Sequence, residues 1–127
     1  MNELTLMSFG YLFGLPEDAD TVIGTRGLPN PYYVEELKHK TGLDQEVRNY
    51  VFSTTKSEAY FETVLSLIRQ RIAFYELYDS PLKQPLIIAV GCTGGKHRSV
   101  SMTCRLAEAL RAEGVSVRVL HRDIEKR

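Results

Sequence analysis

The sequence has no net charge, no tryptophan, few cysteines and no long apolar run. Lysine plus arginine equals aspartate plus glutamate, at 16 each, so the whole molecule has no field that would draw it to nucleic acid or a membrane. Any contact with RNA must therefore come from a local patch. No apolar stretch approaches the roughly 18 residues of a membrane span, and residues 1–3 do not begin an export signal. We expect no membrane contact.

The two cysteines, Cys92 and Cys104, fit no metal-binding spacing. Reduced thiols in a cytoplasmic protein are the expectation, with no metal and no cofactor. The chain has 127 residues, which predicts one domain over 1–127. An apolar content of 43% with 25% charged residues is that of an ordinary soluble globular protein.

The most informative stretch is an apolar run at residues 86–90, followed by a glycine-rich, basic loop at 91–99. The run is continuous and β-prone, which predicts a fully buried strand. Apolar residues at helical spacing then predict a helix over about 98–113, with Gly114 just after its end. An alternating strand over 115–120 follows, so this unit implies two parallel strands joined by a right-handed crossover.

The composition of the glycine-rich loop predicts a bound anion, and the anion we expect is a phosphate. Its glycines permit positive φ angles and close backbone approach, and the free N–H groups of the first helical turn carry partial positive charge. Three basic side chains lie alongside. The alternative is a plain tight connection between strand and helix. The candidate phosphate ligands are Cys92, Thr93, Gly94, Gly95, Lys96, His97, Arg98 and Ser99.

Two nucleotide-binding patterns are excluded. A Walker A loop needs four residues between its glycines and a Ser or Thr after the lysine, but Gly91 is three residues from Gly95 and His97 follows Lys96. The Gly-x-Gly-x-x-Gly pattern is also absent.

Unlike these two patterns, a phosphatase signature is partly matched by the loop. Cys92, five intervening residues, Arg98 and Ser99 resemble the signature of the protein tyrosine phosphatases, in which the cysteine attacks phosphorus and the arginine holds the oxygens. However, Gly91 stands where that family usually has His, and without tryptophan there is no Trp-Pro-Asp acid loop. A cysteine-dependent phosphatase with Cys92 and Arg98 as catalytic residues is therefore the alternative hypothesis.

The rest of the chain supplies further strands and helices. Strands are predicted over 4–9 and 21–23. A long amphipathic helix is predicted over about 56–78, where Thr55 and Glu58 resemble a capping box. The predicted fold class is α/β, a mostly parallel four-stranded sheet flanked by helices. The phosphate-binding loop then lies at the C-terminal edge of the strands.

A second polar loop at 24–31 opens a short predicted helix. Asn30 suits its N-cap and Pro31 its first position, with apolar contacts continuing to Leu37. Arg26 in this loop is either a surface partner of a carboxylate or a ligand-binding residue.

Basic residues follow the last predicted strand. Because parallel strands end at the same edge of a sheet, His121 and Arg122 are expected near the glycine-rich loop. His97 and His121 are candidates to share one anion site, and an imidazole beside a phosphate is expected to have a raised pKa. The cluster continues to residue 127 and is diluted by two acidic residues, which makes it a weak RNA patch.

Nearly the whole chain resembles the C-terminal domain of the RapZ family, bacterial RNase adapter proteins. The loop Gly-Cys-Thr-Gly-Gly-Lys-His-Arg-Ser at 91–99 is a hallmark of that family. Matching positions occur in order at 8–10, 14–16 and 18–20, at Arg26 and 28–31, at 41–44, and at 121–123 and 125–127. One departure concerns the ligand: Gly24 and Gly27 stand where the family usually has Asp and Phe.

The resemblance implies a non-enzymatic module that senses a sugar phosphate of the glucosamine-6-phosphate type. It also implies binding of structured small RNA for presentation to a ribonuclease. Full-length members of the family also carry a Walker-type N-terminal domain. This sequence has no Walker A loop, so a standalone C-terminal domain is expected here, with a separate nucleotide-binding protein as one candidate partner. Seven tyrosines and the long helix suggest a homo-oligomer. The second-loop ligand candidates are Arg26, Asn30 and Tyr32; the RNA-binding candidates are His121, Arg122, Lys126 and Arg127.

Overall fold

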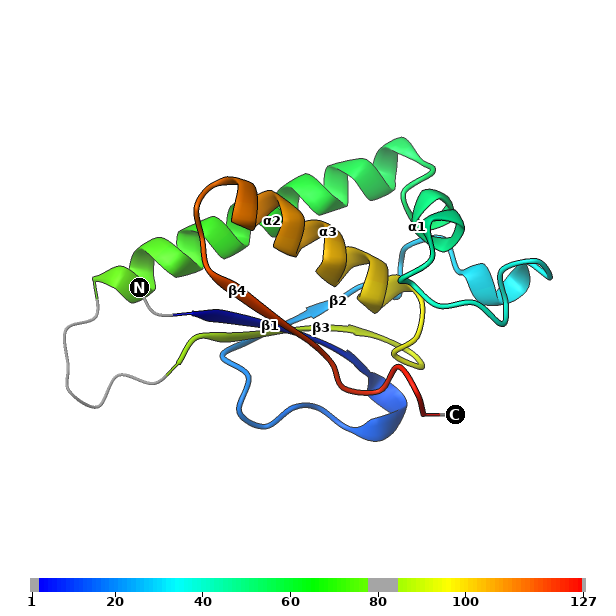
Figure 1. The fold of residues 1–127 in the computed structure, drawn as a ribbon, viewed down its shortest axis with the longest axis horizontal. Helices are drawn as coiled ribbons and strands as arrows, with labels where there is room; N and C mark the ends of the chain where they lie inside the picture. The colour runs from blue at the N-terminus through cyan, green and yellow to red at the C-terminus, as the bar shows by residue number, and fades with distance from the viewer. Residues whose placement is uncertain (1–2, 78–84, 127) are drawn as a thin grey trace.

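The computed structural model describes residues 3–77 and 85–126. Its centre is a four-stranded sheet in the order β2-β3-β1-β4, and every neighbouring pair of strands is parallel (Figure 1). The predicted α/β class with a four-stranded parallel sheet is therefore confirmed. The strands are β1 (Leu4–Gly10), β2 (Thr21–Gly24), β3 (Ile87–Cys92) and β4 (Val117–His121).

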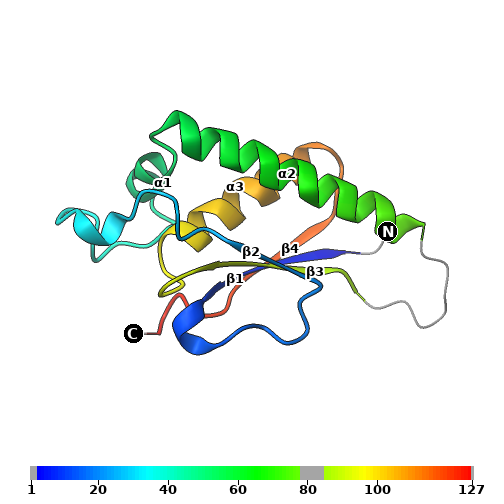
Figure 2. The same cartoon turned by 180° about the vertical axis from the view of Figure 1, so that it is seen from behind.

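The three α-helices lie on one face of the sheet, and the segment that joins β1 to β2 crosses the other face (Figures 1 and 2). The helices are α1 (Gln45–Val51), α2 (Thr55–Glu76) and α3 (Arg98–Ala112). Short 3-10 turns, η1 (Tyr11–Phe13) and η2 (Pro31–Tyr33), follow β1 and β2. The predicted end of α2 at residue 78 lies outside the described residues.

Two local predictions are wrong. The helix expected after Asn30 is a single 3-10 turn, because the chain becomes extended again at Val34. The cap of α2 is Thr54 rather than Thr55, since the Thr54 side chain accepts from the Ser57 amide and the Ser57 hydroxyl accepts from the Thr54 amide.

The core lies between the sheet and the helices. Alternate residues of β1 and β3 are completely buried against the apolar faces of α2 and α3, and burying each such side chain is worth roughly 1.5–3 kcal/mol. Members of this core from the four elements include Leu4, Leu6, Ile88, Val90, Val64, Leu65, Ile68, Leu106 and Leu110. The start of α3 is thereby held over the C-terminal edge of the sheet.

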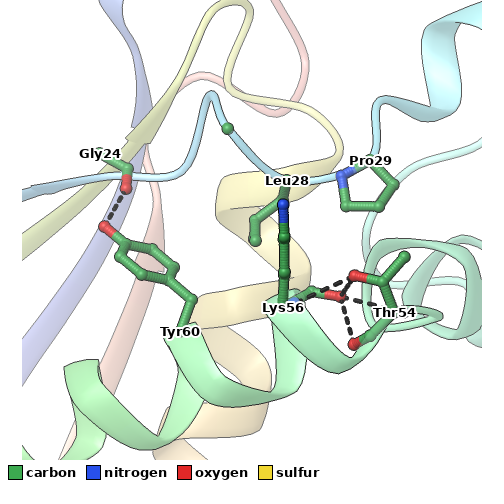
Figure 3. A pocket seen from close by; sticks show the side chains of 8 residues that line it. Gly24, Leu28, Pro29, Thr54, Lys56 and Tyr60 are labelled. Atoms are coloured by element: carbon green, nitrogen blue, oxygen red, sulfur yellow. Dashed lines mark hydrogen bonds between the residues drawn. The ribbon is translucent and has the colours of Figure 1, made fainter.

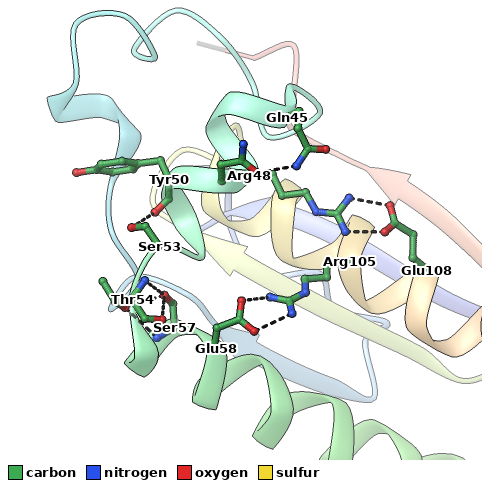
Figure 4. A network of polar contacts seen from close by, with 10 residues as sticks. Gln45, Arg48, Tyr50, Ser53, Thr54, Ser57, Glu58, Arg105 and Glu108 are labelled. Carbon is green, nitrogen blue, oxygen red and sulfur yellow. Dashed lines mark hydrogen bonds and ion pairs between the residues drawn. The ribbon is translucent and has the colours of Figure 1, made fainter.

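Two arginine pairs join the helices to one another (Figure 4). Arg105 of α3 forms two hydrogen bonds with Glu58 of α2, at 2.7 and 2.8 Å, and its guanidinium lies 3.9 Å from the centroid of the Phe61 ring. Arg48 of α1 pairs in the same bidentate way with Glu108 of α3. These contacts fix α3 against both other helices.

We expect Arg105→Met to lower the free energy of unfolding by about 1 kcal/mol, because it removes a bidentate pair and a cation–π contact at a partly exposed site. Urea denaturation measures the change. The control is Arg69→Met, whose pair with Glu113 is more exposed and which should change stability by clearly less than Arg105→Met does. Equal effects of the two substitutions would contradict this role for Arg105.

Candidate functional site

The glycine-rich loop turns at the C-terminal edge of the sheet, between the last residue of β3 and the first of α3. Gly95 has a φ of 76°, in the left-handed region that favours glycine. The turn also lies directly against the end of β1: a Cβ atom on Gly10 would be 2.5 Å from the carbonyl carbon of Gly94. The glycines therefore allow a sharp turn and a close approach at the same point.

The backbone of this turn uses its carbonyls and leaves its amides free. The carbonyl of Thr93 accepts from the Leu12 amide at 3.1 Å, and that of Lys96 accepts from the Gly42 amide at 2.8 Å. Within the described residues, the amides of 94–98 have no hydrogen-bond acceptor, and no side chain caps α3. Free amides at the start of a helix are suited to an anion.

A cleft of about 620 Å³ opens beside these amides, and we call it the basic cleft. Its wall combines the glycine-rich loop with the segment after β2. Lys38, Lys96 and Arg98 line it, and none of its lining residues is acidic. Its remaining lining residues are Leu12, Asn30, Tyr32, Tyr33, His39, Cys92, Thr93, Gly94 and His97. The charge of the wall therefore complements an anion.

Six of the eight predicted phosphate ligands line the basic cleft, and two lie behind it. Gly95 is buried against β1. Ser99 is completely buried, with its hydroxyl 3.1 Å from the sulfur of Cys92. These two residues shape the loop, while ligand contact by the other six stays a prediction.

Arg98 connects the glycine-rich loop to the second polar loop. Its side chain is only 6% exposed, and its Nη1 donates to the carbonyls of Arg26 at 2.5 Å and Leu28 at 3.4 Å. Its Nε is buried and has no hydrogen-bond partner among residues 3–77 and 85–126. An unpaired donor on a buried cation is costly, and a ligand oxygen would satisfy it.

Of the three ligand candidates in the second loop, two line the basic cleft and one does not. Asn30 and Tyr32 line the basic cleft, and the Asn30 side chain accepts from the Tyr32 amide at 3.1 Å. Arg26 instead lies with its guanidinium 4.0 Å from the centroid of the Tyr11 ring and does not line the cleft. What Arg26 contributes is its carbonyl, which anchors Arg98.

The His97 side chain forms a hydrogen bond that holds the segment around residue 40. Its Nε2 donates to the carbonyl of Lys40 at 2.7 Å, and burial, the largest influence, lowers its pKa. This direction is opposite to the one expected beside a phosphate. Because a carbonyl can only accept, Nε2 carries the proton and Nδ1 is left as an acceptor in the neutral ring.

His121 lies at the expected edge of the sheet but does not line the basic cleft. Its Nδ1 is 2.6 Å from the Ser8 hydroxyl and its Nε2 is 3.8 Å from the Cys104 sulfur. Burial lowers the pKa of its ring. The structure therefore does not bring His97 and His121 to one anion site.

The other terminal cations are tied to the protein. Arg122 bonds to Asp123 and to the carbonyl of Gly14, and Lys126 pairs with Asp123 at 2.7 Å. Arg127 lies outside the described residues. A role of these residues in RNA binding stays a prediction.

Sequence reasoning missed Asp123 as a residue of the site. Asp123 bonds to the end of β1, against which the glycine-rich loop lies. It is completely buried and accepts from the Gly10 amide at 2.8 Å. Burial acts to raise its pKa, but hydrogen bonds from Arg122, the Gly10 amide and Lys126 outweigh this and lower it to about 2. The available signal was a carboxylate flanked by cations just after a strand at the ligand edge.

Lys38 and His39 were also missed, because they enter the basic cleft from a segment without regular structure. Among residues 3–77 and 85–126, no group of three or more His, Cys, Asp or Glu side chains is placed to hold a metal ion. The described helices include none that is long and apolar enough to span a bilayer.

Comparison with known proteins agrees with the resemblance read from the motifs. Residues 2–125 match the family described as the RapZ C-terminal domain. The chain is 48% identical over 124 residues to a nucleotide-binding protein of Lactiplantibacillus plantarum, covering 98% of this chain and 41% of the relative. A nucleotide-binding protein of Caldicellulosiruptor saccharolyticus is 46% identical over 123 residues, covering 97% and 41%.

A nucleotide-binding protein of Frankia alni is 48% identical over 120 residues, covering 94% of this chain and 40% of the relative. The chain thus spans about two fifths of the length of these relatives. The family match includes every residue from β1 to β4. The chain belongs to the RapZ C-terminal domain family.

Proposed function

We propose that this chain is a non-enzymatic module that senses a phosphorylated sugar, of the glucosamine-6-phosphate type, in the basic cleft. The observation that carries the proposal is a set of donors without acceptors: the amides of 94–98 and the buried Nε of Arg98. Apart from the Gly95 amide, these donors belong to residues that line the basic cleft, whose described lining has three cationic side chains and no carboxylate. A phosphate dianion satisfies both the hydrogen-bonding and the charge requirement.

The sugar would occupy the half of the basic cleft formed by the segment after β2. Tyr32 is 53% and Tyr33 82% exposed, so both offer a ring face and a hydroxyl to a polar ring. The two rings lie edge to face, 5.7 Å apart, and Lys38 is 4.8 Å from the centroid of the Tyr32 ring. This arrangement supplies contacts to sugar hydroxyls, while the turn at 93–97 supplies those to the phosphate.

We expect Lys96→Gln to weaken binding of glucosamine 6-phosphate about tenfold at low salt, since a charge-assisted contact is worth roughly 1.5 kcal/mol or more. Titration calorimetry measures the affinity. Lys56→Gln, outside the basic cleft, is the matched control and should bind like the parent protein. Absence of binding by the parent, or equal binding by Lys96→Gln, would overturn the proposed site. Glucosamine itself should not bind detectably.

The phosphatase alternative is not favoured by the burial of its nucleophile. Cys92 is only 3% exposed, and its sulfur lies 3.1 Å from the Ser99 hydroxyl. The test is turnover of p-nitrophenyl phosphate between pH 5 and 8, and activity that disappears in Cys92→Ser would support an enzyme instead.

The RNA-binding role, with a ribonuclease and a separate nucleotide-binding protein as further partners, rests on the family resemblance. Assembly into a homo-oligomer rests instead on the seven tyrosines and the long helix α2. Arg122 and Lys126 already pair with Asp123, so only part of their charge is available to an RNA backbone. The test is a salt-dependent mobility shift with structured RNA that weakens in Lys126→Ala.

A further inference from the structure

A second cleft of about 620 Å³ lies beside the loop formed by residues 24–29. It is bounded by that loop and by the first turns of α2 (Figure 3). We call it the Lys56 cleft. None of its lining residues also lines the basic cleft, so the two spaces are separate. The function proposed above does not use it.

Of the described residues that line the Lys56 cleft, one has a charged side chain, Lys56. In Figure 3, Lys56 and Tyr60 both project from α2 toward the loop of residues 24–29. Within the described part of the chain, Lys56 has no ion pair and no hydrogen bond from its ammonium group, whereas five other lysine and arginine residues pair with carboxylates of neighbouring elements. The ammonium group is therefore available to one external negative charge.

The other polar side chains of the Lys56 cleft are already hydrogen-bonded. The Tyr60 hydroxyl donates to the carbonyl of Gly24 at 2.5 Å, and burial raises its pKa, which keeps it a neutral donor. Thr54 and Ser57 bond to each other in the capping box at the start of α2. A ligand with many hydroxyls or several charges would therefore find few partners here.

The remaining wall favours a flat apolar body. Leu28 and Pro29 line one side of the cleft, and the ring of Tyr60 lines the side formed by α2. Gly27 has no side chain, and a Cβ atom built on it would have no neighbour within 4 Å, so the space beside the loop is open. From this single cation, apolar wall and open floor we infer that the Lys56 cleft binds a small monocarboxylate with an aromatic or other flat apolar body.

The test is an NMR titration of the ¹⁵N-labelled protein with benzoate as the probe. We expect benzoate to shift the amide signals of Gly27, Lys56 and Tyr60, and the neutral isostere benzamide to bind at least threefold more weakly. Lys56→Gln should weaken benzoate binding by a similar factor. Lys96→Gln, in the basic cleft, should leave benzoate binding unchanged.

A second variant tests the cleft by filling it. Gly27→Phe adds a ring to the lining of the cleft at a position where a Cβ atom has no neighbour within 4 Å, and Gly27 is not in the left-handed region, so the substitution should fold normally. Benzoate binding should be lost in this variant while its melting temperature stays within about 2 °C of the parent. Benzoate shifts confined to residues 93–98, no shifts at all, or unchanged binding by Gly27→Phe would each overturn the inference.

Discussion

Asp123→Asn is expected to lower the free energy of unfolding by about 2 kcal/mol at pH 7. The carboxylate is completely buried, and its pKa of about 2 lies below its ordinary value of 3.8 because Arg122, Lys126 and the Gly10 amide all donate to it. A shift of that size corresponds to roughly 2 kcal/mol of stability. The amide of Asn keeps the shape but not the charge, so the three donors lose their anionic partner.

The contribution of Asp123 to stability depends on pH, and the direction of its pKa shift determines where the contribution is lost. The folded pKa of Asp123 is depressed, so its contribution is fully present above the unfolded value and is lost as the pH falls from about 4 to about 2. Urea denaturation of parent and variant at pH 7 and pH 2.5 should show a large difference at the first pH and a small one at the second. Asp18→Asn, in the surface segment after β1, is the control and should change stability little at either pH. A difference for Asp123→Asn that is independent of pH would contradict this account.

Gly10→Ala is expected to cost roughly 2–3 kcal/mol of stability and to abolish phosphate binding. The added Cβ would be 2.5 Å from the carbonyl carbon of Gly94 and 2.8 Å from the amide nitrogen of Gly95, and both are backbone atoms. The turn must therefore move away from β1, which displaces the amides proposed to hold the anion. Thermal unfolding and calorimetry with inorganic phosphate measure the two effects.

The matched control for Gly10→Ala is Gly27→Ala. A Cβ on Gly27 meets nothing within 4 Å, and its φ is not positive, so stability and phosphate affinity should match the parent. If Gly10→Ala binds phosphate with parental affinity, the position of the turn against β1 does not matter for binding, and the proposed geometry of the site is wrong.

The sheet and α3 could be predicted because their signals are local. A continuous apolar run at 86–90 has few alternatives to a buried parallel strand, and the next apolar residues repeat at helical spacing. The parallel arrangement then places the glycine-rich loop at the ligand edge without further information. The order of the four strands and the short helix α1 were not predicted, because neither has a distinctive local pattern.

The interior of the site could be predicted only in part, because its contacts connect distant segments. Arg98 was assigned to a ligand by its neighbours in sequence, yet its Nη1 bonds to carbonyls about seventy residues earlier in the chain. Asp123 was read as a charge that dilutes a basic patch, and only the fold brings it to the Gly10 amide. Lys38 joined the basic cleft through an irregular segment that periodicity cannot place.

The most direct test of the central claim is a crystal structure of the protein soaked in inorganic phosphate. The account predicts one phosphate in the basic cleft, with its oxygens hydrogen-bonded to amides within 94–98 and to the Nε of Arg98, and with Lys96 beside it. A phosphate bound only elsewhere, or none at a concentration well above the calorimetric Kd for phosphate, would contradict it.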